Sequence, residues 1–111
     1  MVDLTVDRSY SVYVVRLKKD VLNERKFKEA NPDYTEKKGC VYVGMTGLTP
    51  LERYRNHKEG HKSNKYVKKY GDGLITARYE RLNPMTREEA EKKEVELAEE
   101  LRELGFAVWQ H

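Results

Sequence analysis

Apolar and polar positions divide the chain into short segments that resemble strands and longer segments that resemble helices. Residues 10–17 and 39–45 are compact apolar runs, rich in β-branched and aromatic residues, which are typical of buried strands. Residues 74–82 alternate well enough to predict a third strand. Residues 106–109 predict a short closing strand or a packed hydrophobic tail, and residues 1–8 a frayed arm or an edge strand.

Capping signals predict where the helices begin and end. Thr49 and Glu52 form a capping box around Pro50, and Gly60 follows, so we expect a helix from about residue 50 to 59. Ser63-Asn64 can cap a second, short helix over residues 65–70 that ends at Gly71.

The clearest predicted helix spans residues 86–104. A capping box formed by Thr86 and Glu89 opens it, and Gly105 ends it. Its apolar residues form a narrow stripe at helical spacing, made of Ala90, Leu97, Ala98, Leu101 and Leu104.

Residues 20–38 differ from their surroundings. Residues 21–30 have a helical composition, and Asn31-Pro32-Asp33 predicts a turn. We therefore expect a helical insertion between two strands of one sheet. The whole chain, residues 1–111, has the length of a single domain.

The composition is that of a folded domain with a very polar surface. Charged residues make up 37% and apolar residues 38%, but the apolar residues cluster, which argues against disorder. The single Cys40 excludes an internal disulfide, and its place in a strand predicts a buried thiol. No segment resembles a signal peptide or a membrane span, so we expect a cytoplasmic protein, a location compatible with nucleoid association.

Charge is distributed unevenly along the chain. Residues 51–70 contain seven Lys or Arg against two Glu, a net charge of +5, whereas residues 86–104 contain four against eight, a net charge of −4. A polyanion would bind the basic stretch, although a solvated charged surface explains the same pattern. The candidate nucleic-acid contacts are Arg55, Lys58, Lys62, Lys65, Lys68 and Lys69. We interpret the interleaved Tyr66 and Tyr70 as core residues.

Three residues, on two of the predicted helices, carry candidate chemistry. Arg53 and His57 lie one helical turn apart, and a guanidinium beside an imidazole suits phosphate chemistry. Glu94 falls on the apolar stripe of the long helix, where an ionised carboxylate is costly unless a charge or a metal compensates it. The alternatives are a Glu paired with an Arg and a Glu that reaches the rim.

Taken in chain order, these residues and two tyrosines resemble the GIY-YIG nuclease superfamily. Ser11-Val12-Tyr13 stands where that family has Gly-Ile-Tyr, and Tyr42-Val43-Gly44 where it has Tyr-Ile-Gly. Arg53 with His57 matches the family's first helix, and Glu94 matches its metal-binding glutamate. The resemblance covers residues 10–104. Ser11 replaces a glycine, and the insertion lengthens the spacing between the tyrosines.

The resemblance implies an α+β fold in which helices flank a three-stranded antiparallel sheet. It also implies a metal-dependent endonuclease that hydrolyses phosphodiester bonds with one divalent ion, Mg²⁺ or Mn²⁺, held by Glu94. Arg53 would neutralise phosphoryl charge, and Tyr13, Tyr42 and His57 can position or deprotonate the attacking water. The residues leave the base open, while the resemblance favours Tyr13.

The expected partner is DNA rather than RNA, and single-stranded, double-stranded and structured substrates all stay open. Two other classes of function fit the sequence. One is a catalytically inactive nucleic-acid-binding module on the same fold. The other is a protein-interaction domain that presents its acidic helix to a basic partner.

Overall fold

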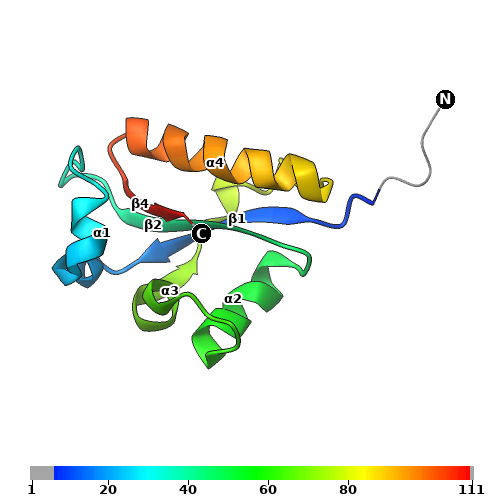
Figure 1. Ribbon diagram of the computed structural model, residues 1–111, viewed down its shortest axis with the longest axis horizontal. Helices are drawn as coiled ribbons and strands as arrows, with labels where there is room; N and C mark the ends of the chain where they lie inside the picture. The colour runs from blue at the N-terminus through cyan, green and yellow to red at the C-terminus, as the bar shows by residue number, and fades with distance from the viewer. Residues whose placement is uncertain (1–6, 111) are drawn as a thin grey trace.

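One mixed sheet of four strands organises the molecule (Figure 1). The computed structural model describes residues 7–110. The strand order is β3-β1-β2-β4, and the bounds are β1 Ser11–Leu17, β2 Cys40–Thr46, β3 Gly71–Leu74 and β4 Ala107–Gln110. β1 pairs antiparallel with both β2 and β3, whereas β4 pairs parallel to β2.

The sheet corrects the expectation of three antiparallel strands. The strand predicted over residues 74–82 is wrong, because β3 occupies Gly71–Leu74 and the 3-10 helix η2 (Thr76–Arg78) follows it. A glycine-rich segment becomes a strand because it pairs with β1, where Gly71 lies opposite Leu17. At the other edge the closing residues form a strand, β4, and not only a packed tail.

The three helices predicted from capping signals are confirmed almost residue for residue. They are α2 (Pro50–Glu59), α3 (Lys65–Tyr70) and α4 (Arg87–Glu103). Thr49 and Thr86 each complete a capping box, and the Asn64 side chain accepts hydrogen bonds from the first turn of α3. Gly60 ends α2 with φ 88°, a left-handed conformation that glycine adopts without strain.

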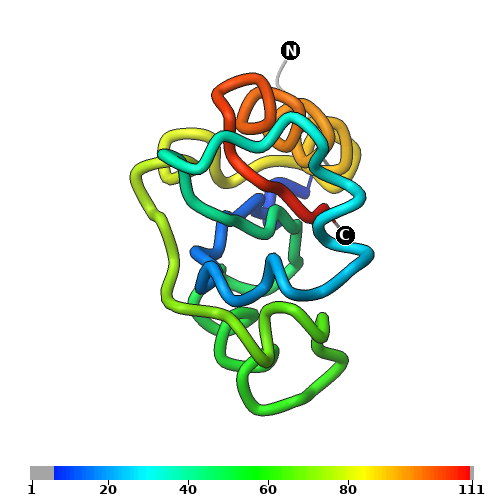
Figure 2. The backbone as a smooth tube through the Cα atoms, turned by 90° about the vertical axis from the view of Figure 1, so that its left-hand side faces the viewer, coloured from blue at the N-terminus to red at the C-terminus, as the bar shows by residue number. Residues whose placement is uncertain are grey.

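The insertion is helical, as expected, but it is divided in two. The 3-10 helix η1 (Lys19–Asn23) buries Val21, and α1 (Arg25–Glu29) buries Phe27. Phe27 stacks against Trp109 of β4 with ring centroids 6.2 Å apart. The insertion therefore packs against the edge of the sheet that β4 forms, as Figure 2 also shows.

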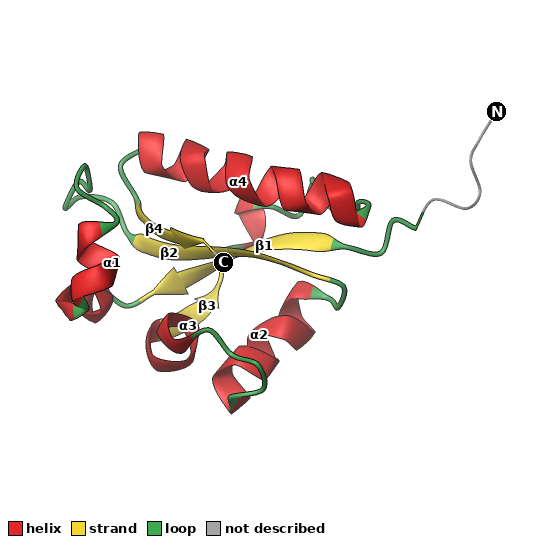
Figure 3. Ribbon diagram, viewed as in Figure 1, coloured by secondary structure: helices red, strands yellow, loops and turns green. Residues whose placement is uncertain are grey.

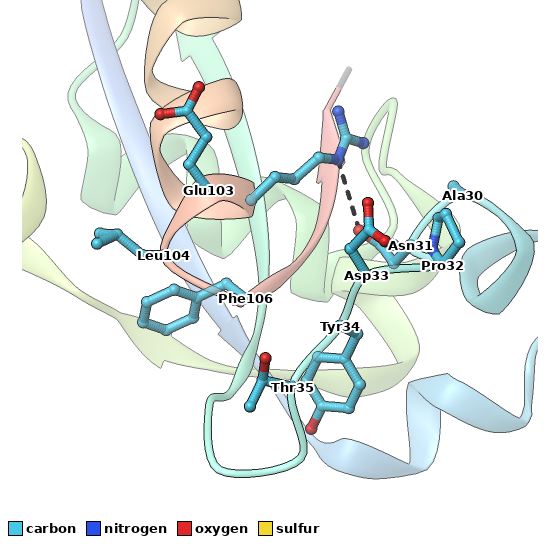
Figure 4. A pocket seen from close by; sticks show the side chains of 11 residues that line it. Ala30, Asn31, Pro32, Asp33, Tyr34, Thr35, Glu103, Leu104 and Phe106 are labelled. Atoms are coloured by element: carbon cyan, nitrogen blue, oxygen red, sulfur yellow. Dashed lines mark hydrogen bonds between the residues drawn. The ribbon is translucent and has the colours of Figure 1, made fainter.

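Asn31, at the end of the insertion, pairs with β4 as a neighbouring strand would. Its Oδ1 accepts the Val108 N–H at 2.7 Å, and its Nδ2 donates to the Val108 carbonyl at 3.0 Å. A contact of 3.5 Å links Asn31 to Arg102, beside a pocket of about 420 Å³ (Figure 4). Asn83 pairs with Val12 of β1 in the same manner, at 2.9 and 2.8 Å.

Helices cover both faces of the sheet: α4 lies on one face, and α2 and α3 lie on the other (Figure 3). The register assigns side chains to these faces, since directly opposite residues point to the same side. Tyr13 lies opposite Gly44 and faces α2, whereas Val43 lies opposite Gln110 and faces α4.

Several smaller expectations have an outcome. Cys40 is buried, as expected, and burial raises the pKa of its thiol. No described helix is both long and apolar enough to cross a membrane. Residues 1–6, where an arm or an edge strand was expected, lie outside the described residues.

Candidate active site

Two neighbouring strands bring Tyr13 and Tyr42 to the face that α2 covers. Both are 1% exposed, and their ring centroids lie 6.1 Å apart. Gly44 makes room for them, because a Cβ atom there would lie 2.7 Å from Cζ and Oη of Tyr13 and 2.9 Å from Cε1 of Tyr42. The glycine of the second motif is therefore required by the close approach of two rings.

His57 lies behind Tyr13. It is fully buried, and its Nε2 lies 2.8 Å from Tyr13 Oη. Its Nδ1 accepts the backbone N–H of Asn64 at 2.9 Å. Since a backbone N–H can only donate, Nδ1 carries no proton, and the neutral ring has its proton on Nε2. His57 thus donates to the Tyr13 oxygen, which favours a positioning role and leaves Nε2 unable to accept a proton.

Arg53 lies on α2, one turn before His57, but its side chain extends toward the loop between α2 and α3, whereas His57 contacts Tyr13 Oη. It is half-buried, and its guanidinium donates to the carbonyls of His61 and Lys62 at 3.2 and 2.8 Å. These bonds hold the loop between α2 and α3. A guanidinium has further N–H donors, so Arg53 can still contact an anion in the cleft that it lines.

Glu94 enters from α4 on the opposite face. It is 5% exposed and shares the buried stripe of the helix with Ala90, Leu97, Ala98 and Leu101, as its helical position predicts. Gln110, the last residue of β4, donates its Nε2 to Glu94 Oε1 at 3.2 Å. The sequence reasoning missed Gln110, since it depends on the pairing of β4 with β2.

These groups border one cleft of about 320 Å³. Tyr13, Tyr42, Arg53 and Glu94 line it together, although they belong to four separate elements. His57 is absent from the lining and supports Tyr13 from within the fold.

Three further residues line the cleft, and the sequence reasoning missed them: Met45, Arg87 and Glu91. Arg87 and Glu91 form an ion pair of 3.3 Å on the exposed rim. Their spacing from Glu94, seven and three residues, places all three on one face of a helix, and that signal was available in the sequence.

Burial dominates the acidity of both phenols. It raises the pKa of Tyr13 to about 12, although the Arg53 charge and hydrogen bonding with Tyr42 act in the opposite direction. Burial, and then the neighbouring Tyr13, raise the pKa of Tyr42 well above its usual range. Both phenols are therefore protonated at neutral pH in the protein without a bound cation.

The oxygen donors fit a hard divalent cation. Glu94 offers a carboxylate within the cleft, and Glu91 offers a second one nearby. Mg²⁺ keeps several waters and is commonly held by one or two carboxylates together with substrate phosphate oxygens. Within residues 7–110 there is no group of three or more His, Cys, Asp or Glu side chains that could hold a metal.

The six candidate nucleic-acid contacts are all exposed: Arg55, Lys58, Lys62, Lys65, Lys68 and Lys69. Several of them also have contacts within the fold. Lys58 donates to the carbonyls of Lys68 and Gly71 and so holds the end of α3, and Lys69 pairs with Glu24 at 3.5 Å. Tyr66 and Tyr70 are buried, which confirms their interpretation as core residues.

Comparison with known proteins found no matching family model, no matching curated protein and no matching solved structure.

Proposed function

We propose that this chain is a divalent-metal-dependent endonuclease of the GIY-YIG type that hydrolyses phosphodiester bonds in DNA. One observation carries the proposal: Tyr13, Tyr42, Arg53 and Glu94 line the same cleft. They come from β1, β2, α2 and α4, and a core built only for stability has no need to direct two phenols, a guanidinium and a buried carboxylate at one opening.

Each residue has a role that its surroundings support. Arg53 lines the cleft, so its guanidinium can neutralise charge on the phosphoryl oxygens. Glu94 would hold the cation, and Gln110 positions its carboxylate by donating a hydrogen bond to Oε1. When bound, the cation supplies a Lewis acid that polarises the phosphate and stabilises the leaving oxygen.

Tyr13 is the proposed base for the attacking water. His57 donates a hydrogen bond to the Tyr13 oxygen, which favours the phenolate, and Arg53 adds positive charge nearby. The pKa of Tyr13 must fall from about 12 for this role, and a cation held at Glu94 acts in the same direction. Tyr42 keeps its proton and lies beside Tyr13 as a hydrogen-bonding neighbour.

A nicking assay tests the proposal. Purified protein is incubated with supercoiled plasmid, single-stranded DNA and RNA, in Mg²⁺, Mn²⁺ or EDTA. Arg53→Ala and Glu94→Ala should each lower the cleavage rate by about 10²–10³-fold, the usual effect of removing one transition-state stabiliser. Glu99→Gln, an exposed charge on the same helix as Glu94, is the matched control and should cleave at the wild-type rate.

Thermal melts accompany the assay, because Arg53 also holds the loop at His61 and Lys62. A folded Glu94→Ala variant that cuts at the wild-type rate would remove the metal site from the proposal. Nucleic-acid binding without cleavage in any divalent ion would instead identify the inactive binding module.

A further inference from the structure

A second group of cations lies at the end of the sheet opposite the cleft. The cleft contains residues from the start of β1 and the end of β2, whereas this second cavity, of about 460 Å³, is bordered by the end of β1 and the start of β2. Four cations line it, Arg16, Lys18, Lys19 and Arg78, together with Asp72 and the ring of Phe106.

The four cations outnumber the single carboxylate that lines the cavity, Asp72. None of the four cations forms an ion pair within residues 7–110, whereas Arg8, Arg25 and Arg87 each pair with a glutamate. Lys19 donates to the backbone carbonyl of Glu36 at 3.2 Å, and Arg78 lies over the Phe106 ring at 5.3 Å. Clustered cations without carboxylate partners attract an anionic ligand.

The cluster lies on the α4 face, but it continues onto the other face. Val41 and Val43 are two residues apart on β2 and therefore point to the same face, the one that α4 covers. Arg16 lies directly opposite Val41 and points to that face as well. The Lys18 N–H donates to the Tyr70 carbonyl at 2.9 Å, which joins the end of β1 to the end of α3. Lys68, on the last turn of α3, therefore adjoins the cluster, whereas Lys69 on the same turn pairs with Glu24 at 3.5 Å.

The cations of this region that have no glutamate partner within the described residues form one basic belt, composed of Lys68, Lys18, Lys19, Arg16 and Arg78. The belt turns round the sheet at the edge strand β3. In Figure 2 the chain rises along this edge from α3, below the sheet, to the segment that contains η2, above it. A ligand that follows the belt must therefore bend round a single edge strand.

We infer that the basic belt binds single-stranded nucleic acid, whose phosphates follow the cations from α3 round β3 to the cavity beside Phe106. A duplex is stiff over about 150 base pairs and does not follow so sharp a turn. A single strand is flexible, and grooves that bind it combine cations with aromatic rings. This inference rests on the proposed function only in taking nucleic acid as the partner, and it gives the substrate as single-stranded.

Fluorescence anisotropy at several salt concentrations tests the inference. The probes are labelled oligothymidylate of about 20 nucleotides, longer than the ~4–16 that one such groove covers, and a duplex of equal length. EDTA is present throughout, so cleavage plays no part. The variant is Arg16→Gln/Lys18→Gln/Arg78→Gln. The matched control, Lys26→Gln/Lys28→Gln/Lys92→Gln, removes three exposed lysines from α1 and α4.

For the single strand, the slope of log K for binding against log salt should be shallower by about 2 in the triple variant, since each of three phosphate contacts contributes ~0.7. The control should keep the wild-type slope. Asp72→Asn should bind the single strand more tightly, because it removes the carboxylate that lines the cavity. The wild-type protein should bind the single strand more tightly than the duplex.

An unchanged slope in the triple variant, or an equal loss in the control, would overturn the inference. So would duplex binding as tight as single-strand binding, or equally tight binding of polyglutamate, which would indicate an acidic protein partner. A negative result here leaves the cleavage assay unaffected. Conversely, the absence of nicking leaves a positive binding result valid.

Discussion

Replacing Gly44 with alanine should displace the ring of Tyr13. The added Cβ would lie 2.7 Å from Cζ and Oη of Tyr13. Real Cβ atoms essentially never lie within 3.0 Å of such a neighbour. Tyr13 is fully surrounded, at 1% exposure, and its hydroxyl is bonded to His57, so the ring has no free space to enter. The contact must be relieved by moving a strand or by breaking that bond.

The magnitude follows from two opposing effects. Overpacking a tight core costs about 1–3 kcal/mol. Alanine also restricts the unfolded chain, which returns roughly 0.4–1 kcal/mol. The net loss in unfolding free energy is about 1–2 kcal/mol, and for a domain of this size that lowers Tm by about 4–8 °C. Cleavage should fall more, by as much as ~10²-fold, because misplacing a reacting group by about 1 Å has that effect.

Differential scanning calorimetry and the plasmid nicking assay measure the two effects. Gly39→Ala is the matched control: it lies just before the same strand, and the nearest atom to its added Cβ is 3.9 Å away. Its Tm and cleavage rate should equal those of the wild type. If Gly44→Ala melts and cuts as Gly39→Ala does, Tyr13 is not held where the cleft requires it.

Three further predictions follow from single contacts. Burial raises the pKa of Tyr13 from about 10 to about 12, so the stability that the protonated phenol contributes is present in full below pH 10 and is lost as the pH rises through 12. Between pH 10 and 12 the Tm of Tyr13→Phe should therefore fall less steeply than the Tm of the wild type. Equal slopes in the two proteins would mean that another group titrates in this range. Nitrogen-detected NMR of His57 should show a protonated Nε2 and an unprotonated Nδ1, and the opposite tautomer would contradict the bond from Asn64. Asn31→Ala leaves the buried Val108 N–H without the Asn31 oxygen and should lower the unfolding free energy by about 1–3 kcal/mol in urea titration, whereas Asp33→Ala, an exposed neighbour, should leave it unchanged.

Local signals in the sequence were enough to predict the helices. α2 has its bounds fixed by Thr49, Pro50, Glu52 and Gly60, which all lie within or next to the helix. The burial of Glu94 was likewise predictable, because helical periodicity alone places it on the apolar stripe of α4.

Features that depend on distant pairing escaped the sequence reasoning. Residues 71–74 contain two glycines and become a strand only through β1, and the alternation over residues 74–82 comes from side chains around a 3-10 turn. β4 pairs with a strand more than sixty residues earlier, so neither its parallel direction nor the contact from Gln110 to Glu94 could be deduced locally. The role of His57 also depended on a distant partner, Tyr13.

The asparagine that pairs with β4 has a consequence for how the protein behaves at high concentration. An uncovered edge strand is a template on which a second molecule can add its own strand. The Asn31 amide occupies both the N–H and the carbonyl of Val108, and Phe27 covers the adjoining Trp109, so this edge is closed to such growth. The insertion therefore shields this edge of the sheet, and a variant with a shortened insertion should expose β4 to pairing with a second molecule.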